Sequence, residues 1–126
     1  MKTLDLVLKH KWYDMIACGE KKEEYREIKR YYISRLLMAA LLCKGEVVWK
    51  NLTPFLSRYY DNNKSELKQY LGFSFIFKNF SSVTFHRGYT NTTMTFKIED
   101  MKIGIGNPNW GAPNEEVFII KLGKRI

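Results

Sequence analysis

The densest run of charged residues lies between Gly19 and Arg26, where the sequence reads GEKKEEYR. If residues 22–28 are extended, Glu24 and Arg26 point to the same face of a strand, because side chains alternate along it. Lys21 enters from the turn just before them. A carboxylate between two cations stays ionised and holds both side chains, so the group could offer a fixed positive charge to a phosphate. The alternative is a solvated, salt-bridged segment, whose exposed charges contribute little to stability.

A second candidate is the stretch from Leu67 to Ile98, whose 32 residues include no Asp or Glu. It combines basic residues with aromatic rings, and cations meet phosphates while exposed rings stack on unpaired bases. Most of its alternating Phe residues are predicted to be core, so we expect Tyr89, close to the basic Arg87, to face a ligand. The basic residues are Lys68, Lys78, Arg87 and Lys97, and the rings are Tyr70, Phe73, Phe75, Phe77, Phe80, Phe85, Tyr89 and Phe96.

Three further side chains could take part in chemistry. Trp110 stands in a loop that the Asn, Pro and Gly content predicts over residues 107–114. Its ring either caps the core or forms one side of a cleft on which a base stacks. His10 and His86 are the only histidines, and two imidazoles could act as acid and base in a ribonuclease. The favoured interpretation is that each is a surface or hydrogen-bonded residue.

Charge and composition narrow the class of partner. The net charge is +8, from 21 Lys and Arg against 13 Asp and Glu in 126 residues. Such a surplus attracts polyanions, namely nucleic acid, an anionic membrane or acidic small molecules, although it can also serve only solubility. The sequence has no nucleotide-phosphate motif, no serine nucleophile motif and no Cys/His spacing for zinc. We therefore expect no metal and no cofactor.

The apolar pattern predicts the elements that position these residues. Alternation over residues 4–8 predicts a strand, and apolar spacing over 12–16 predicts a short helix that ends at Gly19. The clearest helix is predicted over 33–41, from an apolar face at i, i+3, i+4, i+7 and i+8. Further strands are predicted over 46–50, 73–77, 83–88, 94–98 and 117–122, with short helices over 54–60 and 65–72. This order predicts one domain, residues 1–126, of the α+β class, with a mixed or mainly antiparallel sheet that closes towards a barrel.

The location is predicted from the N-terminus, the apolar runs and the cysteines. The N-terminus lacks the apolar segment of a signal peptide, and the longest apolar-rich run, residues 33–43, is too short to cross a bilayer. Cys18 and Cys43 lie within helix-like apolar patterns and are expected to be buried, reduced thiols. We expect a soluble, cytoplasmic protein with no membrane partner.

The charged segment also resembles the G-x-K-x-x-E-x-R pattern of the ASCH domain family. ASCH domains are similar to PUA domains, so the resemblance implies a small PUA-like β-barrel with flanking helices and an RNA-binding cleft lined by the motif. It extends over essentially the whole chain, through the strand at 4–8, the Trp-containing helix, the segment 85–89 and the last strand. The matching residues are Gly19, Lys21, Glu24 and Arg26, followed by the basic pair Lys29 and Arg30 and by Trp110 and Gly111.

The resemblance also implies that some members of the family are enzymes. One branch is similar to amidohydrolases that deacylate N4-acetylcytidine, in which a Lys, a Thr and a distant Glu act. Lys21 matches the Lys, but Glu24 stands at the position of the Thr, so this activity is not carried over to the chain. Other members have been described as ribonucleases. Lys21 and Glu24 are therefore the candidate catalytic residues of an enzymatic alternative.

The sequence favours an RNA-binding domain with a basic cleft. Lys21 and Arg26 would bind phosphate or a base edge, and Glu24 would order them. Arg87, Tyr89 and Trp110 would add charge and stacking. The alternatives are an RNA-directed enzyme in the same cleft, either a ribonuclease or a modified-nucleoside hydrolase, and a domain that binds a small ligand or a protein.

Overall fold

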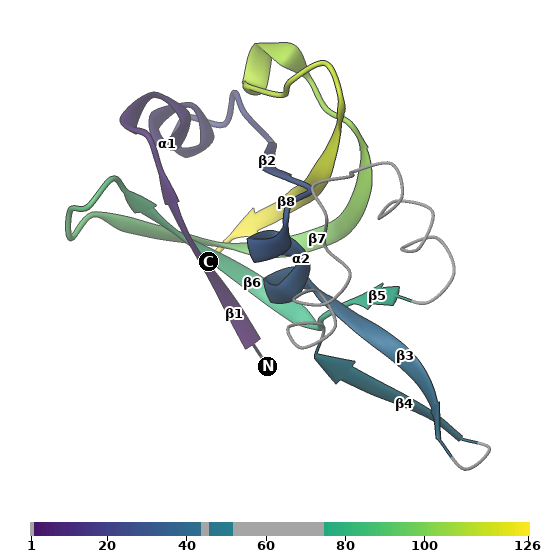
Figure 1. Ribbon diagram of the computed structural model, residues 1–126. Helices are drawn as coiled ribbons and strands as arrows, with labels where there is room; N and C mark the ends of the chain where they lie inside the picture. The colour runs from purple at the N-terminus through teal and green to yellow at the C-terminus, as the bar shows by residue number, and fades with distance from the viewer. Residues whose placement is uncertain (1, 44–45, 52–74) are drawn as a thin grey trace. The chain divides into compact units, whose positions relative to one another are not determined.

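The computed structural model describes residues 2–43, 46–51 and 75–126. The helices predicted over 54–60 and 65–72 lie outside these residues, as does the start of the strand predicted over 73–77. The other predicted strands and the helix at 12–16 are confirmed. In chain order the elements are β1 (Lys2–Leu8), α1 (His10–Ala17), β2 (Glu23–Glu27), α2 (Arg30–Leu36), β3 (Leu37–Cys43), β4 (Glu46–Asn51), β5 (Phe75–Phe77), β6 (Phe80–Arg87), β7 (Thr93–Ile105), the 3-10 helix η1 (Pro108–Trp110) and β8 (Glu116–Arg125) (Figure 1).

The chain forms two compact units, of which unit 1 comprises Met1–Arg26 and Asn79–Ile126 and unit 2 comprises Glu27–Lys78. Unit 1 contains α1 and a five-stranded sheet in the order β1-β6-β7-β8-β2. β1 pairs in parallel with β6, whereas β6 with β7 and β7 with β8 are antiparallel. The sheet is therefore mixed, and it curls into a half-barrel (Figure 1).

The curl of this sheet has a local cause in β7. The register of β7 against β8 shifts between Phe96 and Ile98 and again between Ile98 and Asp100. Such irregularities bend a strand and increase its twist. The buried residues of the sheet include the alternating leucines of β1 and a continuous run, Val117–Ile120, in β8. A strand with consecutive buried side chains is covered on both faces.

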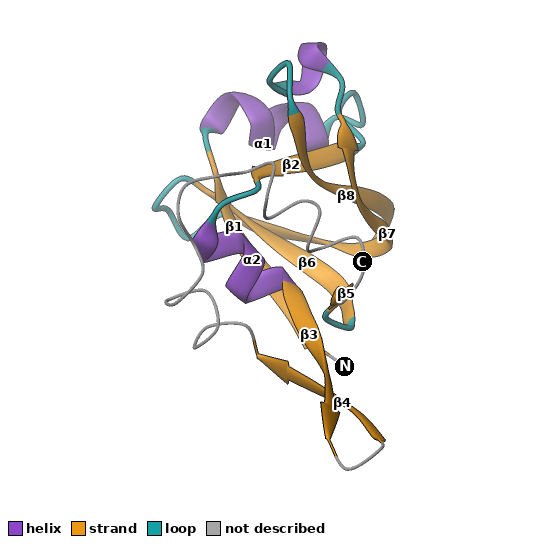
Figure 2. Ribbon diagram, turned by 45° about the vertical axis from the view of Figure 1, so that its right-hand side comes forward, coloured by secondary structure: helices purple, strands orange, loops and turns teal. Residues whose placement is uncertain are grey.

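In unit 2 the structure differs from the helix predicted over 33–41. The helix predicted over 33–41 ends at Leu36, and the chain continues directly into β3 (Figure 2). β3 pairs antiparallel with β4 on one side and with β5 on the other. A short apolar run fits a central strand as well as a helix. Hydrogen bonding along both edges of β3 makes it a strand, and the periodicity of the sequence does not encode those partners.

The α+β class and the mixed sheet are confirmed. The prediction of one domain over residues 1–126 stays a prediction. Neither α1 nor α2, the α-helices of the described residues, has the length and apolar character needed to cross a membrane.

Candidate functional site

The motif residues Lys21, Glu24 and Arg26 form an ion cluster in unit 1, which we call the charged cluster. Glu24 Oε1 lies 2.9 Å from Lys21 Nζ, and Glu24 Oε2 lies 2.8 Å from Arg26 Nη2. This confirms that Glu24 and Arg26 share one face of β2. Arg26 Nη2 also donates to the carbonyl of Val7 in β1 at 3.1 Å. Since β1 and β2 are the two outer strands of the sheet, this bond joins its opposite edges.

Lys21 and Glu24 of the charged cluster are buried and Arg26 is partly buried, contrary to the alternative of a solvated segment. Lys21 is 3% exposed and Glu24 is 5% exposed. Lys21 Nζ donates to the carbonyl of Trp110 at 2.7 Å and lies 4.7 Å from the centre of the Trp12 ring. Buried charges require partners of this kind, because desolvation costs several kcal/mol per ion. The segment is therefore a packed part of the fold as well as a candidate site.

The strand β2 and the residues before it hold the loop that carries Trp110. Tyr25 Oη accepts a hydrogen bond from the backbone N–H of Asn107 at 3.0 Å and donates to Glu23 Oε1 at 2.8 Å. Lys21 holds the other end of the same turn through the Trp110 carbonyl. Burial, opposed by the Asn107 N–H and reinforced by the charge of Glu23, raises the pKa of Tyr25 to about 12. The phenol therefore keeps its proton at neutral pH and remains a donor to Glu23.

Two glycines allow the loop to pack this closely. A Cβ atom at Gly106 would lie 2.6 Å from a ring carbon of Tyr25, and one at Gly111 would lie 2.9 Å from the Trp12 ring. Gly111 also has a φ of 93°, which L side chains rarely adopt. The position of Trp110 thus depends on contacts from β2, from α1 and from within its own loop.

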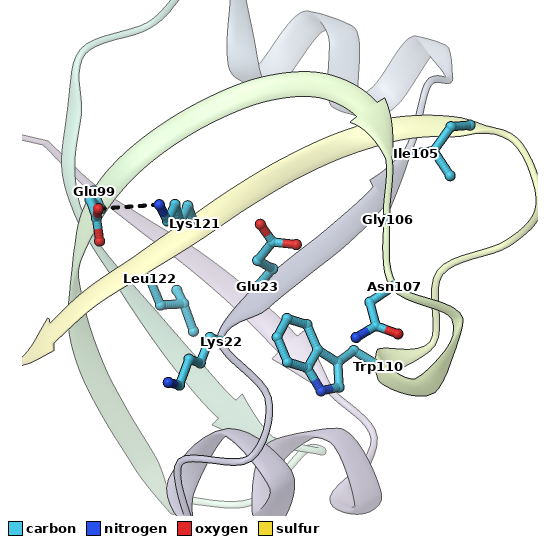
Figure 3. Close-up of a pocket in the computed structure, with 9 residues that line it drawn as sticks. All are labelled: Lys22, Glu23, Glu99, Ile105, Gly106, Asn107, Trp110, Lys121 and Leu122. Atoms are coloured by element: carbon cyan, nitrogen blue, oxygen red, sulfur yellow. Dashed lines mark ion pairs between the residues drawn. The ribbon is translucent and has the colours of Figure 1, made fainter.

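A pocket of about 550 Å³ opens in unit 1 beside this loop (Figure 3). Figure 3 shows Glu23 and Trp110 between the loop that carries Asn107 and the ion pair of Lys121 with Glu99. That pair is 3.3 Å long and about half exposed on both sides. The lining residues are Lys22, Glu23, Glu99, Ile105, Gly106, Asn107, Trp110, Lys121 and Leu122. The pocket therefore combines one indole ring with cationic and anionic groups.

Of the residues predicted for the site, Trp110 lines the pocket. The residues of the charged cluster are not in the lining, but Lys21 contacts the Trp110 carbonyl. Arg87 and Tyr89 belong to the β6–β7 hairpin and line neither. Tyr89 is 98% exposed.

Sequence reasoning missed five polar lining residues: Lys22, Glu23, Glu99, Asn107 and Lys121. For Glu23 a signal was present, because alternation along β2 turns it to the face opposite Glu24. Whether the other four residues line a pocket depends on the pairing of β8 beside β2, and no local sequence pattern predicts that pairing.

Arg87 makes a bidentate pair with Asp14 of α1, with Nε 2.9 Å from Oδ1 and Nη2 3.0 Å from Oδ2. These hydrogen bonds, with the charges of Arg87 and His10, hold the pKa of the Asp14 carboxyl below its usual value although desolvation opposes them. The stability that the pair contributes is present above the ordinary aspartate pKa and is lost as the pH falls through the lowered one.

We expect an NMR titration to show Asp14 ionising below the usual range for aspartate, and Arg87→Ala to raise that pKa towards the ordinary value. An Asp14 titration that is the same in both proteins would show that the pair does not persist in solution.

The remaining candidates have structural roles. His86 Nε2 lies 3.0 Å from Asp5 Oδ1, in agreement with a hydrogen-bonded surface residue. His10 packs against Gly88, where a Cβ would come within 2.9 Å of its Nε2.

The prediction of a buried Cys18 is wrong: it is exposed, because it follows the buried Ile16 by two positions and so leaves the buried face of the helix. The side chain of Cys43 is not among those that the structure describes. No three His, Cys, Asp or Glu side chains gather into a potential metal site in the described ranges.

The fold and the site define an α+β protein with a curled mixed sheet, a buried charged cluster and a polar pocket that contains one tryptophan. No protein-family model, curated protein or solved structure matches the chain.

Proposed function

We propose that this protein binds single-stranded nucleic acid, with RNA as the favoured partner, as a PUA-like domain of the ASCH type. The observation that carries the proposal is the pocket, in which the Trp110 ring lies with two lysines and two glutamates in a chain of net charge +8. The resemblance of the segment Gly19–Arg26 to the ASCH motif supports RNA as the partner. A cytoplasmic location goes with this proposal, because an exposed thiol such as Cys18 stays reduced there.

The chemistry of the pocket suits a nucleotide. Its volume of about 550 Å³ falls in the range of small-molecule sites. A tryptophan face stacks on a base whatever its identity, and the exposed Lys22 can meet a phosphate. The half-exposed pair of Lys121 with Glu99 is weak in water. Lys121 can therefore exchange its carboxylate partner for a phosphate at small cost.

The charged cluster supports binding more than catalysis. Two partners, Glu24 and the Trp110 carbonyl, engage the Lys21 ammonium, and neither Lys21 nor Glu24 lines the pocket. An amine held in this way is poorly placed to attack a carbonyl. We propose that the cluster sets the position of Trp110, and that the enzymatic alternative is the second choice.

The proposal is tested by the salt dependence of RNA binding, measured by fluorescence anisotropy of a labelled single-stranded RNA. With about four to six phosphate contacts, the logarithm of the association constant should fall against the logarithm of salt concentration with a slope of roughly −3 to −4. A domain that binds only an uncharged ligand or a protein should show no RNA affinity. The proposal fails if binding is undetectable at about 50 mM salt, or if the affinity does not respond to salt.

A further inference from the structure

We infer that the pocket receives one unpaired base that carries an amino group on its edge, with Glu23 as the acceptor. This inference rests on the proposed function and adds a preference among bases. It concerns Glu23, a residue beside the ASCH-type motif positions and on the opposite face of β2 from Glu24.

The acceptor character of Glu23 follows from its chemistry. An ionised carboxylate has two oxygens and several lone pairs but no donor. One oxygen, Oε1, already accepts the hydroxyl of Tyr25 at 2.8 Å. Because that hydroxyl also accepts the N–H of Asn107 at 3.0 Å, its proton points towards Glu23. The carboxylate is held in one orientation, and it retains capacity to accept a hydrogen bond from a ligand.

The position of Glu23 relative to Trp110 decides which part of a base it meets. Both side chains line the same pocket and lie next to each other in Figure 3. A base stacked on the indole face would present its edge to the carboxylate. The N6 amino group of adenine and the N4 amino group of cytosine are donors, whereas hypoxanthine and uracil carry a carbonyl oxygen at the same place. A carbonyl oxygen facing a carboxylate leaves two acceptors in contact without a proton between them.

Two lysines of the pocket are available to the phosphate of the same nucleotide. Lys22 precedes Glu23 in the chain and is exposed, and Lys121 lies across the pocket on β8. A nucleotide with its base on Trp110 and its edge at Glu23 would place its phosphate within the field of these lysines. Glu99 already pairs with Lys121 at 3.3 Å. Glu23, whose recorded partner is an uncharged phenol, is therefore the carboxylate assigned to the base.

The test compares bases that carry an amino group with bases that carry a carbonyl oxygen at the same ring position, a change that also converts the adjacent ring nitrogen from an acceptor into an N–H donor. Anisotropy measurements at one salt concentration would use the full chain with oligocytidylate against oligouridylate, and with oligoadenylate against oligoinosinate. We expect the amino-bearing member of each pair to bind about five- to tenfold more tightly. In Glu23→Gln the preference should fall below about twofold, because an amide offers both a donor and an acceptor. Glu20→Gln, a change of an exposed carboxylate outside the pocket lining, should retain the preference.

The outcomes distinguish the base preference from the proposed nucleic-acid binding on which it rests. Equal affinity for both members of each pair, with the salt dependence intact, would overturn the base preference and leave nucleic-acid binding standing. Binding of none of the oligonucleotides would remove both. A preference that survives in Glu23→Gln would overturn the assignment to this residue. If Glu23→Gln does not fold, Tyr25→Phe replaces it: loss of the hydroxyl that orients Glu23 should reduce the preference, and an unchanged preference would count against the arrangement.

Discussion

Replacement of Glu24 by alanine should lower the free energy of unfolding by about 3–5 kcal/mol, the usual cost of removing one partner from a buried ion pair. Glu24 forms ion pairs with both Lys21 and Arg26 in unit 1. Its loss leaves Lys21, which is 3% exposed, with the Trp110 carbonyl as its remaining recorded oxygen partner. An ammonium buried with so little compensation is costly, since several kcal/mol of hydration has been given up. Chemical denaturation followed by circular dichroism measures the change.

The matched control is Glu99→Ala. Glu99 also pairs with a lysine, Lys121 at 3.3 Å, but both side chains are about half exposed. Exposed pairs contribute about 0–1 kcal/mol, so this variant should unfold almost as the parent does. Equal effects of the two substitutions would mean that the charged cluster is hydrated in solution and does not hold the fold.

Trp110→Ala should weaken the binding of single-stranded RNA about tenfold to a hundredfold, because a stacked base contributes about 1–3 kcal/mol. The substitution removes the ring from the pocket but keeps the backbone carbonyl that accepts from Lys21. The loop should therefore stay in place, and the loss of affinity should come with little loss of stability. Anisotropy titrations and denaturation of the same variant give the two values.

Tyr89→Ala is the comparison for this experiment. Tyr89 is an aromatic residue of the β6–β7 hairpin, 98% exposed and not part of the pocket lining. If the pocket is the interface, its removal should change affinity little. A loss as large as that of Trp110→Ala would place a stacking surface on the hairpin, as the sequence pattern around Arg87 suggests, and would count against the pocket as the sole contact.

The local sequence predicts β1, α1, β6, β8 and the first part of β7, together with part of the candidate site. Alternating leucines specify β1, helical spacing specifies α1, and the two-residue offset of Glu24 and Arg26 places them on one face of β2. These features depend on periods of two and about four residues, which neighbouring positions are enough to establish. The same locality limits the prediction over 37–43, where a helical period and a central strand share one apolar pattern.

Other properties of the protein arise from contacts between distant parts of the chain. Lys21 becomes a buried residue because the carbonyl of Trp110, 89 positions away, and the ring of Trp12 close around its ammonium. The pocket exists because β8 hydrogen-bonds next to β2, where the Leu122 N–H meets the Lys22 carbonyl at 3.0 Å. Charge patterning alone predicts a solvated segment here, since the sign of a residue carries no information about what covers it. Burial depends on strand order and sheet curvature, and these follow from the packing of the whole unit.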